Sequence, residues 1–144
     1  MIAKTMATKK HPVGLIVNAR EDLRFVHGLR MPNESGGYYD EAIRRAKEAM
    51  KYGTLKAIIW HQGEADCHHP EAYKEKIIQL MTDLRNDLGM PDLPVVVGQI
   101  AQWNWTKKPY IPEGTKPFND MIKEISTFLP IVLVCLRRTY SVEG

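Results

Sequence analysis

The sequence predicts one α/β domain built on a parallel sheet with helices on both faces. Three apolar runs, at residues 13–19, 55–60 and 93–101, are typical of strands that are buried on both faces. Segments with apolar residues at helical spacing separate these runs, and alternating strands and helices favour parallel pairing through right-handed crossovers. A length of 144 residues suits one domain.

The first two elements are a strand and a helix. The run "VGLIVNA" at residues 13–19 follows Pro12 and predicts a strand near the middle of the sheet. The next segment, "YYDEAIRRAKEAMKYG", predicts a helix of about three turns, with Gly53 as its stop. Its apolar residues at helical spacing are Ala42, Ile43, Ala46, Ala49 and Met50.

The run "LKAIIW" at residues 55–60 predicts the second strand, and a polar cluster begins at its carboxyl end. Pro70 suits the first position of the following helix and Gly89 its end. One apolar stripe lies between them, formed by Tyr73, Ile77, Leu80, Met81, Leu84 and Leu88. This is the longest predicted helix.

The run "LPVVVGQIA" at residues 93–101 predicts the third strand. A last helix is expected at residues 117–129, because five residues share one apolar face: Phe118, Met121, Ile122, Ile125 and Leu129. Residues 20–37 show no usable period, and residues 131–144 show no clear closing element.

Composition and charge narrow the class of protein. Hydrophobic residues make up 44% and charged residues 26%, as in ordinary soluble domains. We find no apolar run near the roughly 20 residues of a membrane helix and no apolar core of a secretory signal at the start. A net charge of +3 without a basic stripe gives no reason to expect nucleic acid. Localisation and oligomeric state stay open, and we expect no cofactor.

The polar cluster "HQGEADCHH" after residues 55–60 is the candidate functional loop. Unpaired polar side chains are costly to bury, and open α/β sheets bind ligands where strands end. A metal site is the first interpretation, but the possible ligands lie in one short loop without a second ligand pair. We therefore predict no metal; His68 and His69 fit a helix start, and Cys67 a small buried residue.

The block "WHQGEAD" resembles the "WHQGES-D" block of carbohydrate esterases of the sialic acid-specific acetylesterase type, also called carbohydrate esterase family 6, in the SGNH hydrolase superfamily. The stretches "VGLIVNAR", "AYKEKIIQLMTDLRNDLGMPDLPVVVGQIA" and "PFNDMIKEISTFLP" resemble further consecutive pieces of that domain. The resemblance implies a flavodoxin-like, three-layer α/β/α sandwich. It also implies removal of O-acetyl groups from xylan or sialic acid by a Ser-His-acid mechanism.

The resemblance also implies roles for individual residues. Gln62 would donate its side-chain amide to the oxyanion of the tetrahedral intermediate. Glu64 would orient the catalytic histidine and balance its charge. Five residues would bind substrate or shape the pocket: Asn18, Arg20, His61, Asp66 and Gln99. Without the resemblance, these polar side chains fit capping of a loop or a strand end at least as well.

Two blocks of the family have no match in residues 1–144. The family carries its nucleophilic serine in a Gly-Gln-Ser-Asn block upstream of the "NAR" strand, and its histidine in a late Asp-x-x-His block. The serines Ser35, Ser126 and Ser141 fit a turn, a helix and the tail, and His11 and His27 precede the motif. We therefore expect a single partial domain that is incomplete at both ends.

Two functions follow as expectations. In the first, residues 1–144 are a partial carbohydrate O-acetylesterase domain whose partner is an acetylated carbohydrate, with at most trace activity as written. In the second, they are a non-catalytic carbohydrate-binding or structural remnant, in which Trp103 and Trp105 stack on sugar. Two tryptophans beside prolines are more often loop anchors packed on the edge of a domain.

The irregular stretches suggest frameshifts. Where the family reads "NAR-Gly-Gly-(Ser/Thr)-Ser-Ile-x-x-Trp", this chain reads "NAREDLRFVHG". Read one base earlier, the codons of residues 21–28 can spell Gly-Gly-Ser-Ser-Ile-Arg-Ser-Trp, and a similar shift from Ile131 yields a more family-like strand. We hypothesise that the glycine pair of the oxyanion hole lies out of frame.

Overall fold

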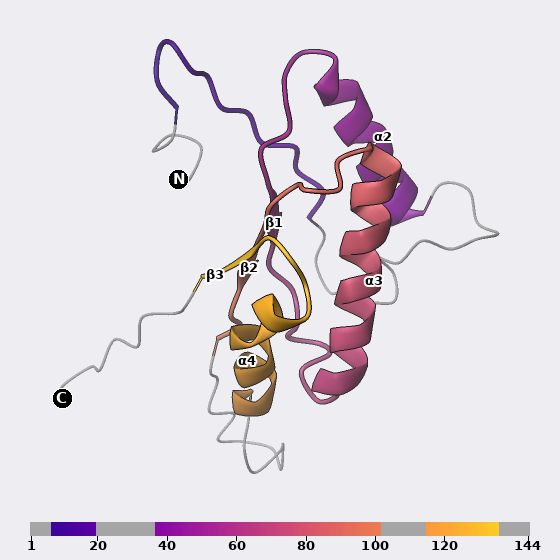
Figure 1. Ribbon diagram of the computed structural model, residues 1–144, viewed down its shortest axis with the longest axis vertical. Helices are drawn as coiled ribbons and strands as arrows, with labels where there is room; N and C mark the ends of the chain where they lie inside the picture. Colours follow the sequence, from indigo (N-terminus) through magenta and orange to yellow (C-terminus); the bar gives the residue numbers. More distant parts are fainter. Residues whose placement is uncertain (1–6, 20–36, 102–114, 136–144) are drawn as a thin grey trace.

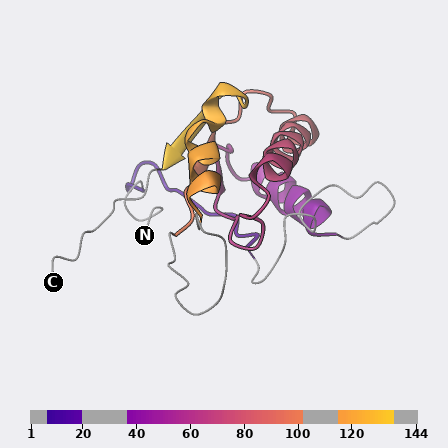
Figure 2. The same ribbon diagram turned by 90° about the horizontal axis from the view of Figure 1, so that it is seen from below.

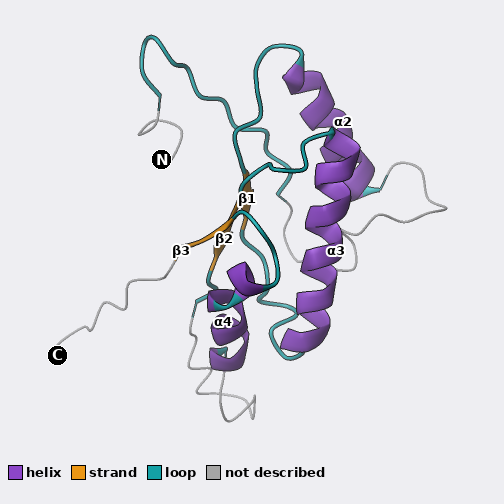
Figure 3. Ribbon diagram, viewed as in Figure 1, coloured by secondary structure: helices purple, strands orange, loops and turns teal. Residues whose placement is uncertain are grey.

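A computed structural model describes residues 7–19, 37–101 and 115–135 of the chain. The elements, in chain order, are α2 (Tyr38–Met50), β1 (Ile58–Trp60), α3 (Pro70–Leu88), β2 (Val95–Gly98), α4 (Lys116–Lys123), the 3-10 helix η2 (Ile125–Thr127) and β3 (Val132–Cys135). Figure 1 shows their arrangement, and Figure 3 separates helices from strands. The predicted mixed α/β class is confirmed.

The three strands form one parallel sheet in the order β1-β2-β3. In the register, Ile59 is opposite Val96, and Val96 is opposite Leu133. Helices connect successive strands, as crossovers between parallel neighbours require. The carboxyl ends of all three strands therefore lie at one edge of the sheet, where the loop after β1 begins.

The helices predicted at residues 38–53 and 70–88 are confirmed as α2 and α3, but α2 ends at Met50 with Lys51 as its C-cap and not at the predicted stop, Gly53. Pro70 occupies the first turn of α3, and Gly89 ends it in the left-handed conformation at φ 66°, which glycine adopts without steric cost. The helix predicted at residues 117–129 is instead divided into α4 and η2. The hydroxyl of Thr127 donates to the carbonyl of Glu124 at 2.7 Å, a side-chain bond that competes with helical pairing.

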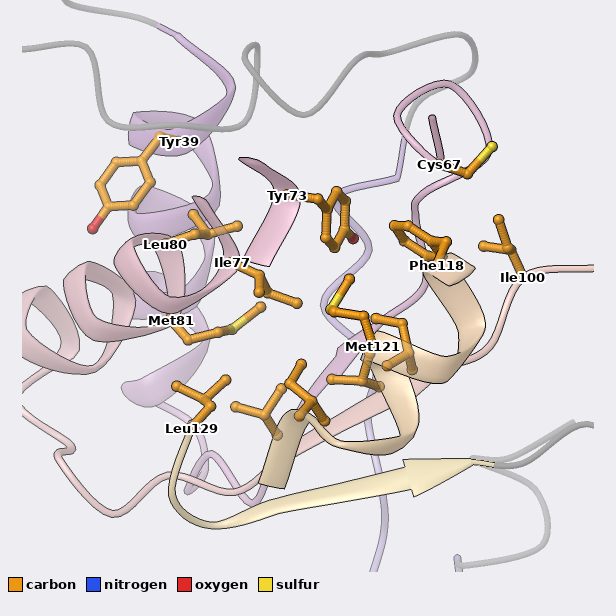
Figure 4. Close-up of a cluster of buried hydrophobic side chains, with 14 residues drawn as sticks. Tyr39, Cys67, Tyr73, Ile77, Leu80, Met81, Ile100, Phe118, Met121 and Leu129 are labelled. Carbon is orange, nitrogen blue, oxygen red and sulfur yellow. The ribbon is translucent and has the colours of Figure 1, made fainter. Parts of the chain in front are cut away.

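The core lies between the sheet and the helices, as Figure 4 shows. The rings of Tyr73 and Phe118 meet edge to face, with centroids 4.7 Å apart. Val95 and Val97 of β2 are fully buried among side chains of α3 and α4. Most buried apolar side chains of the described residues thus belong to one cluster on one face of the sheet.

The opposite face of the sheet carries exposed apolar side chains. Side chains alternate along a strand, and Ile59 and Leu133 are 51% and 66% exposed. Figure 2 shows the described helices on the other side of the sheet. The prediction that residues 55–60 are buried on both faces is therefore wrong, because the described residues supply the sheet and a helical layer on one face.

Residues 13–19 do not form the predicted mid-sheet strand. They have no regular secondary structure, and all seven are exposed. The carbonyl of Val17 accepts a hydrogen bond from Arg45 of α2 at 2.9 Å. A strand in the middle of a sheet needs pairing on both edges and cover on both faces, and the described residues give this segment neither.

Strand β3 was missed by the sequence analysis, which predicted no closing element after residue 131. Val132–Cys135 pairs with β2 along its whole length. The buried guanidinium of Arg85 donates to the carbonyl of Pro130 at 2.8 Å just before this strand. The strand that pairs with β3 and the arginine that bonds just before it are therefore both distant from it in sequence.

Candidate active site

The loop between β1 and α3 leaves the sheet through tight turns. The N–H of Asp66 donates to the carbonyl of Gly63 at 3.0 Å, and the N–H of His69 donates to the carbonyl of Asp66 at 3.1 Å. The buried thiol of Cys67 lies 3.4 Å from the carbonyl of Glu64, to which it donates. These bonds within the loop give its polar side chains a defined backbone.

Gly63 allows this loop to pack directly on α4. It is buried and has a φ of 151°. A Cβ atom at this position would lie 2.3 Å from Cζ of Phe118 and 3.2 Å from Cγ2 of Ile100. Only glycine fits this close approach, so the glycine of the "WHQGEAD" block is required by packing.

Tyr73 of α3 fixes the main chain of the loop. Its hydroxyl accepts a hydrogen bond from Nε1 of Trp60 at 2.9 Å and donates to the carbonyl of Gln62 at 2.8 Å. Burial strongly raises the pKa of the Tyr73 hydroxyl, because a buried phenolate is poorly solvated. The hydroxyl therefore keeps the proton that it donates to Gln62.

We expect Tyr73→Phe to lower the free energy of unfolding by about 1–3 kcal/mol, because the carbonyl of Gln62 and the indole N–H of Trp60 lose a buried partner.

The same variant also tests whether the pKa of the Tyr73 hydroxyl is raised in the folded protein. In the wild type, stability should fall as the pH rises above about 10, since the unfolded chain releases the tyrosine proton there and the folded chain retains it. Urea unfolding between pH 8 and 11 measures both effects, and an equal alkaline loss in the variant would contradict the assignment to Tyr73.

The structure brings together two of the predicted site residues, Gln62 and Asp66. Nε2 of Gln62 donates to Oδ2 of Asp66 at 2.7 Å, and both side chains are half-buried. Glu64, between them in the chain, is exposed. The loop thus presents one oriented amide and one solvent-accessible carboxylate.

The histidine of the block points elsewhere. Trp60 packs against the core, so the next side chain along the chain, His61, faces the opposite side of the sheet. A Cβ on Gly98 would lie 2.7 Å from Cδ2 of His61, so the imidazole lies over β2 on the exposed face.

The remaining predicted site residues bond to the backbone of other elements. The side chain of Asn18 donates to the carbonyl of Tyr38 at 3.3 Å, at the beginning of α2. The amide of Gln99, just after β2, donates to the carbonyl of Asn119 at 3.2 Å. Arg20 lies outside the described residues.

Asn119 is a supporting residue that the sequence analysis missed. It is 4% exposed on α4, and its side chain accepts from the N–H of Ile100 at 3.1 Å and donates to the carbonyl of Ile100 at 3.0 Å. This amide pairs with the backbone as a neighbouring strand would. The sequence signal that could have indicated Asn119 is its position as a polar residue between apolar neighbours on the inner face of the helix.

The serine among the described residues, Ser126, lies in η2 between α4 and β3, not in the loop after β1. Ser35, Ser141 and His27 lie outside the described residues, as do Trp103 and Trp105.

Within residues 7–19, 37–101 and 115–135, no group of three or more His, Cys, Asp or Glu side chains is arranged to hold a metal ion. No helix in these same ranges has the length and apolar character to cross a membrane.

Comparison with known proteins gives a consistent result. The family described as "Carbohydrate esterase, sialic acid-specific acetylesterase" matches residues 1–136. A probable carbohydrate esterase of Arabidopsis thaliana is 37% identical over 67 residues, which span 44% of this chain and 26% of the relative. The X-ray structure of the same Arabidopsis protein matches with a TM-score of 0.58 and 25% identity, over 83% of this chain and 48% of that chain. This chain thus spans at most about half the length of the relatives it matches.

Proposed function

The chain belongs to the sialic acid-specific acetylesterase family of carbohydrate esterases, and from this membership we propose that it forms part of a domain that hydrolyses acetyl esters on carbohydrates. One observation carries the assignment of the site. The amide of Gln62 is held at the carboxyl edge of the sheet by two groups, the Tyr73 hydroxyl on its backbone and the Asp66 carboxylate on its side chain. A donor held in advance is what stabilisation of an oxyanion requires.

In the proposed reaction, a serine oxygen attacks the acetyl carbonyl while a histidine takes its proton, and the sugar hydroxyl leaves with a proton from that histidine. Water then cleaves the acetyl-serine bond by the same steps and releases acetate. Gln62 donates to the negative oxygen of each tetrahedral intermediate, and the exposed Glu64 carboxylate orients the histidine. The other proposed pocket residues are Asn18, Arg20, His61, Asp66 and Gln99.

The serine and the histidine of this reaction are not assigned to any described residue. We propose that residues 1–144 are a partial domain with at most trace hydrolysis, and that the coding frame shifts near Arg20 and Pro130. Sequencing the gene and its flanking DNA tests this part. A Gly-Gln-Ser-Asn block upstream, with a glycine pair and a late Asp-x-x-His block restored by one-base shifts, is the expected result; an intact frame without these blocks would contradict it.

The binding function is tested on the chain itself. We expect acetylated xylo-oligosaccharides to shift the side-chain amide signals of Gln62 in NMR spectra of ¹⁵N-labelled protein, with little release of acetate. Gln62→Ala should weaken this binding about tenfold, the loss expected for one hydrogen bond. The matched control is Gln79→Ala, because Gln79 is an exposed glutamine on α3.

The deacetylated oligosaccharide separates the two candidate functions. An esterase site prefers the acetylated sugar, whereas a carbohydrate-binding remnant binds both forms alike. Equal binding of the two sugars would favour the remnant, and no binding of either would contradict both functions. Rapid release of acetate would contradict the proposal that this domain is partial.

A further inference from the structure

The carboxylate of Asp66 accepts a hydrogen bond directly from the side-chain amide of Gln62, so Asp66 does more than shape a pocket. We infer that Asp66 is a positioning residue, which sets the orientation of the Gln62 amide and so decides which of its two ends is presented to the substrate. The inference rests on the proposed function, because it concerns the same donor. It adds a role that neither the block "WHQGEAD" nor the family match assigns.

The chemistry of the pair permits one orientation of the amide. An ionised carboxylate only accepts hydrogen bonds, whereas a glutamine side chain has a donor end and an acceptor end. Nε2 of Gln62 faces Oδ2 of Asp66 at 2.7 Å, a length typical of a charge-assisted bond. A reversed amide would place Oε1 of Gln62 against Oδ2 of Asp66, and two acceptors at this distance repel each other.

The carboxylate can impose this orientation because its own backbone is held. The N–H and the carbonyl of Asp66 are both bonded within the loop, to Gly63 and His69. The carbonyl of Gln62 is held by the Tyr73 hydroxyl. With both backbones fixed, the bond to Asp66 directs the donor end of the Gln62 side chain. Under the proposed function, this directed Nε2 group is the donor to the oxyanion.

Asp66→Asn is the direct test, because asparagine keeps the shape of aspartate but offers both a donor and an acceptor. It accepts either orientation of the Gln62 amide. In spectra of the free protein, we expect the side-chain amide signals of Gln62 to shift and broaden while the backbone signals of the core stay in place. Affinity for the acetylated oligosaccharide should fall about tenfold, as for loss of the donor itself.

The chain contains a matched control pair. On the exposed face of α3, Nε2 of Gln79 donates to Oδ1 of Asp83 at 2.9 Å, with the same spacing in sequence. Asp83→Asn should leave the Gln62 signals and the sugar affinity unchanged. Asp66→Ser, which also keeps a short polar side chain in the turn, replaces Asp66→Asn if that variant does not fold.

Two results would overturn the inference: unchanged Gln62 amide signals in Asp66→Asn, or changed signals with an affinity equal to that of the wild type. Failure of the proposed function gives a different result. In that case the acetylated sugar fails to shift the Gln62 signals of the wild-type protein, while the effect of Asp66→Asn on the free protein is still measured.

Discussion

Replacing Gly63 with alanine is expected to lower the free energy of unfolding by about 4 kcal/mol, the sum of a strained backbone and an overpacked contact. The added Cβ would lie 2.3 Å and 2.6 Å from two ring carbons of Phe118. That ring is fully buried against Tyr73, so it has little room to move. The φ of 151° adds strain for any residue with a side chain. Chemical denaturation followed by circular dichroism measures the loss.

The double variant Gly63→Ala/Phe118→Leu separates the two causes. Leucine removes the ring carbons that meet the new Cβ but leaves the backbone strain, so the two substitutions should couple favourably. Gly53→Ala is the control, because nothing lies within 4 Å of a Cβ at Gly53. A Gly63→Ala protein as stable as Gly53→Ala would contradict the packing of the loop on α4.

Replacing Arg85 with methionine is expected to cost about 3 kcal/mol of stability, because buried carbonyls lose a charged donor. Arg85 is 5% exposed. Its guanidinium donates to the carbonyls of Leu93 at 3.0 Å, Pro130 at 2.8 Å and Ile131 at 3.4 Å. These bonds join α3 to the segments that enter β2 and β3, so we expect β3 to lose protection first in hydrogen exchange.

Two variants sharpen this prediction. Arg44→Met removes an exposed arginine of α2 that pairs with Glu41, and it should change stability far less than Arg85→Met, because a solvent-exposed ion pair contributes little. Arg85→Lys should recover little of the loss, because an ammonium group cannot reproduce the planar fork of a guanidinium. Equal stability of the Arg85→Met and Arg44→Met proteins would show that the bonds of Arg85 contribute nothing.

The residues that hold the candidate site in place could be predicted from sequence only in part. The block at residues 60–66 indicates Gln62 and Glu64 through its resemblance to the family motif alone. Tyr73 and Phe118 were predicted as apolar helix positions, which is correct, but their contacts with Gln62 and Gly63 depend on how α3 and α4 pack. A spacing pattern indicates which face of a helix is buried, not which atoms it meets.

The sequence by itself determined the helices α2 and α3, the proline and glycine that bound α3, and the α/β class, because helix signals act over a few neighbouring residues. Only the tertiary structure decided the roles of the apolar runs: residues 13–19 are exposed coil, Ile59 is on an exposed face, and β3 is a paired strand. The physical reason is that a strand is stabilised by its neighbours and by the layers on its faces. Those partners are distant in sequence, so a run of apolar residues alone does not specify them.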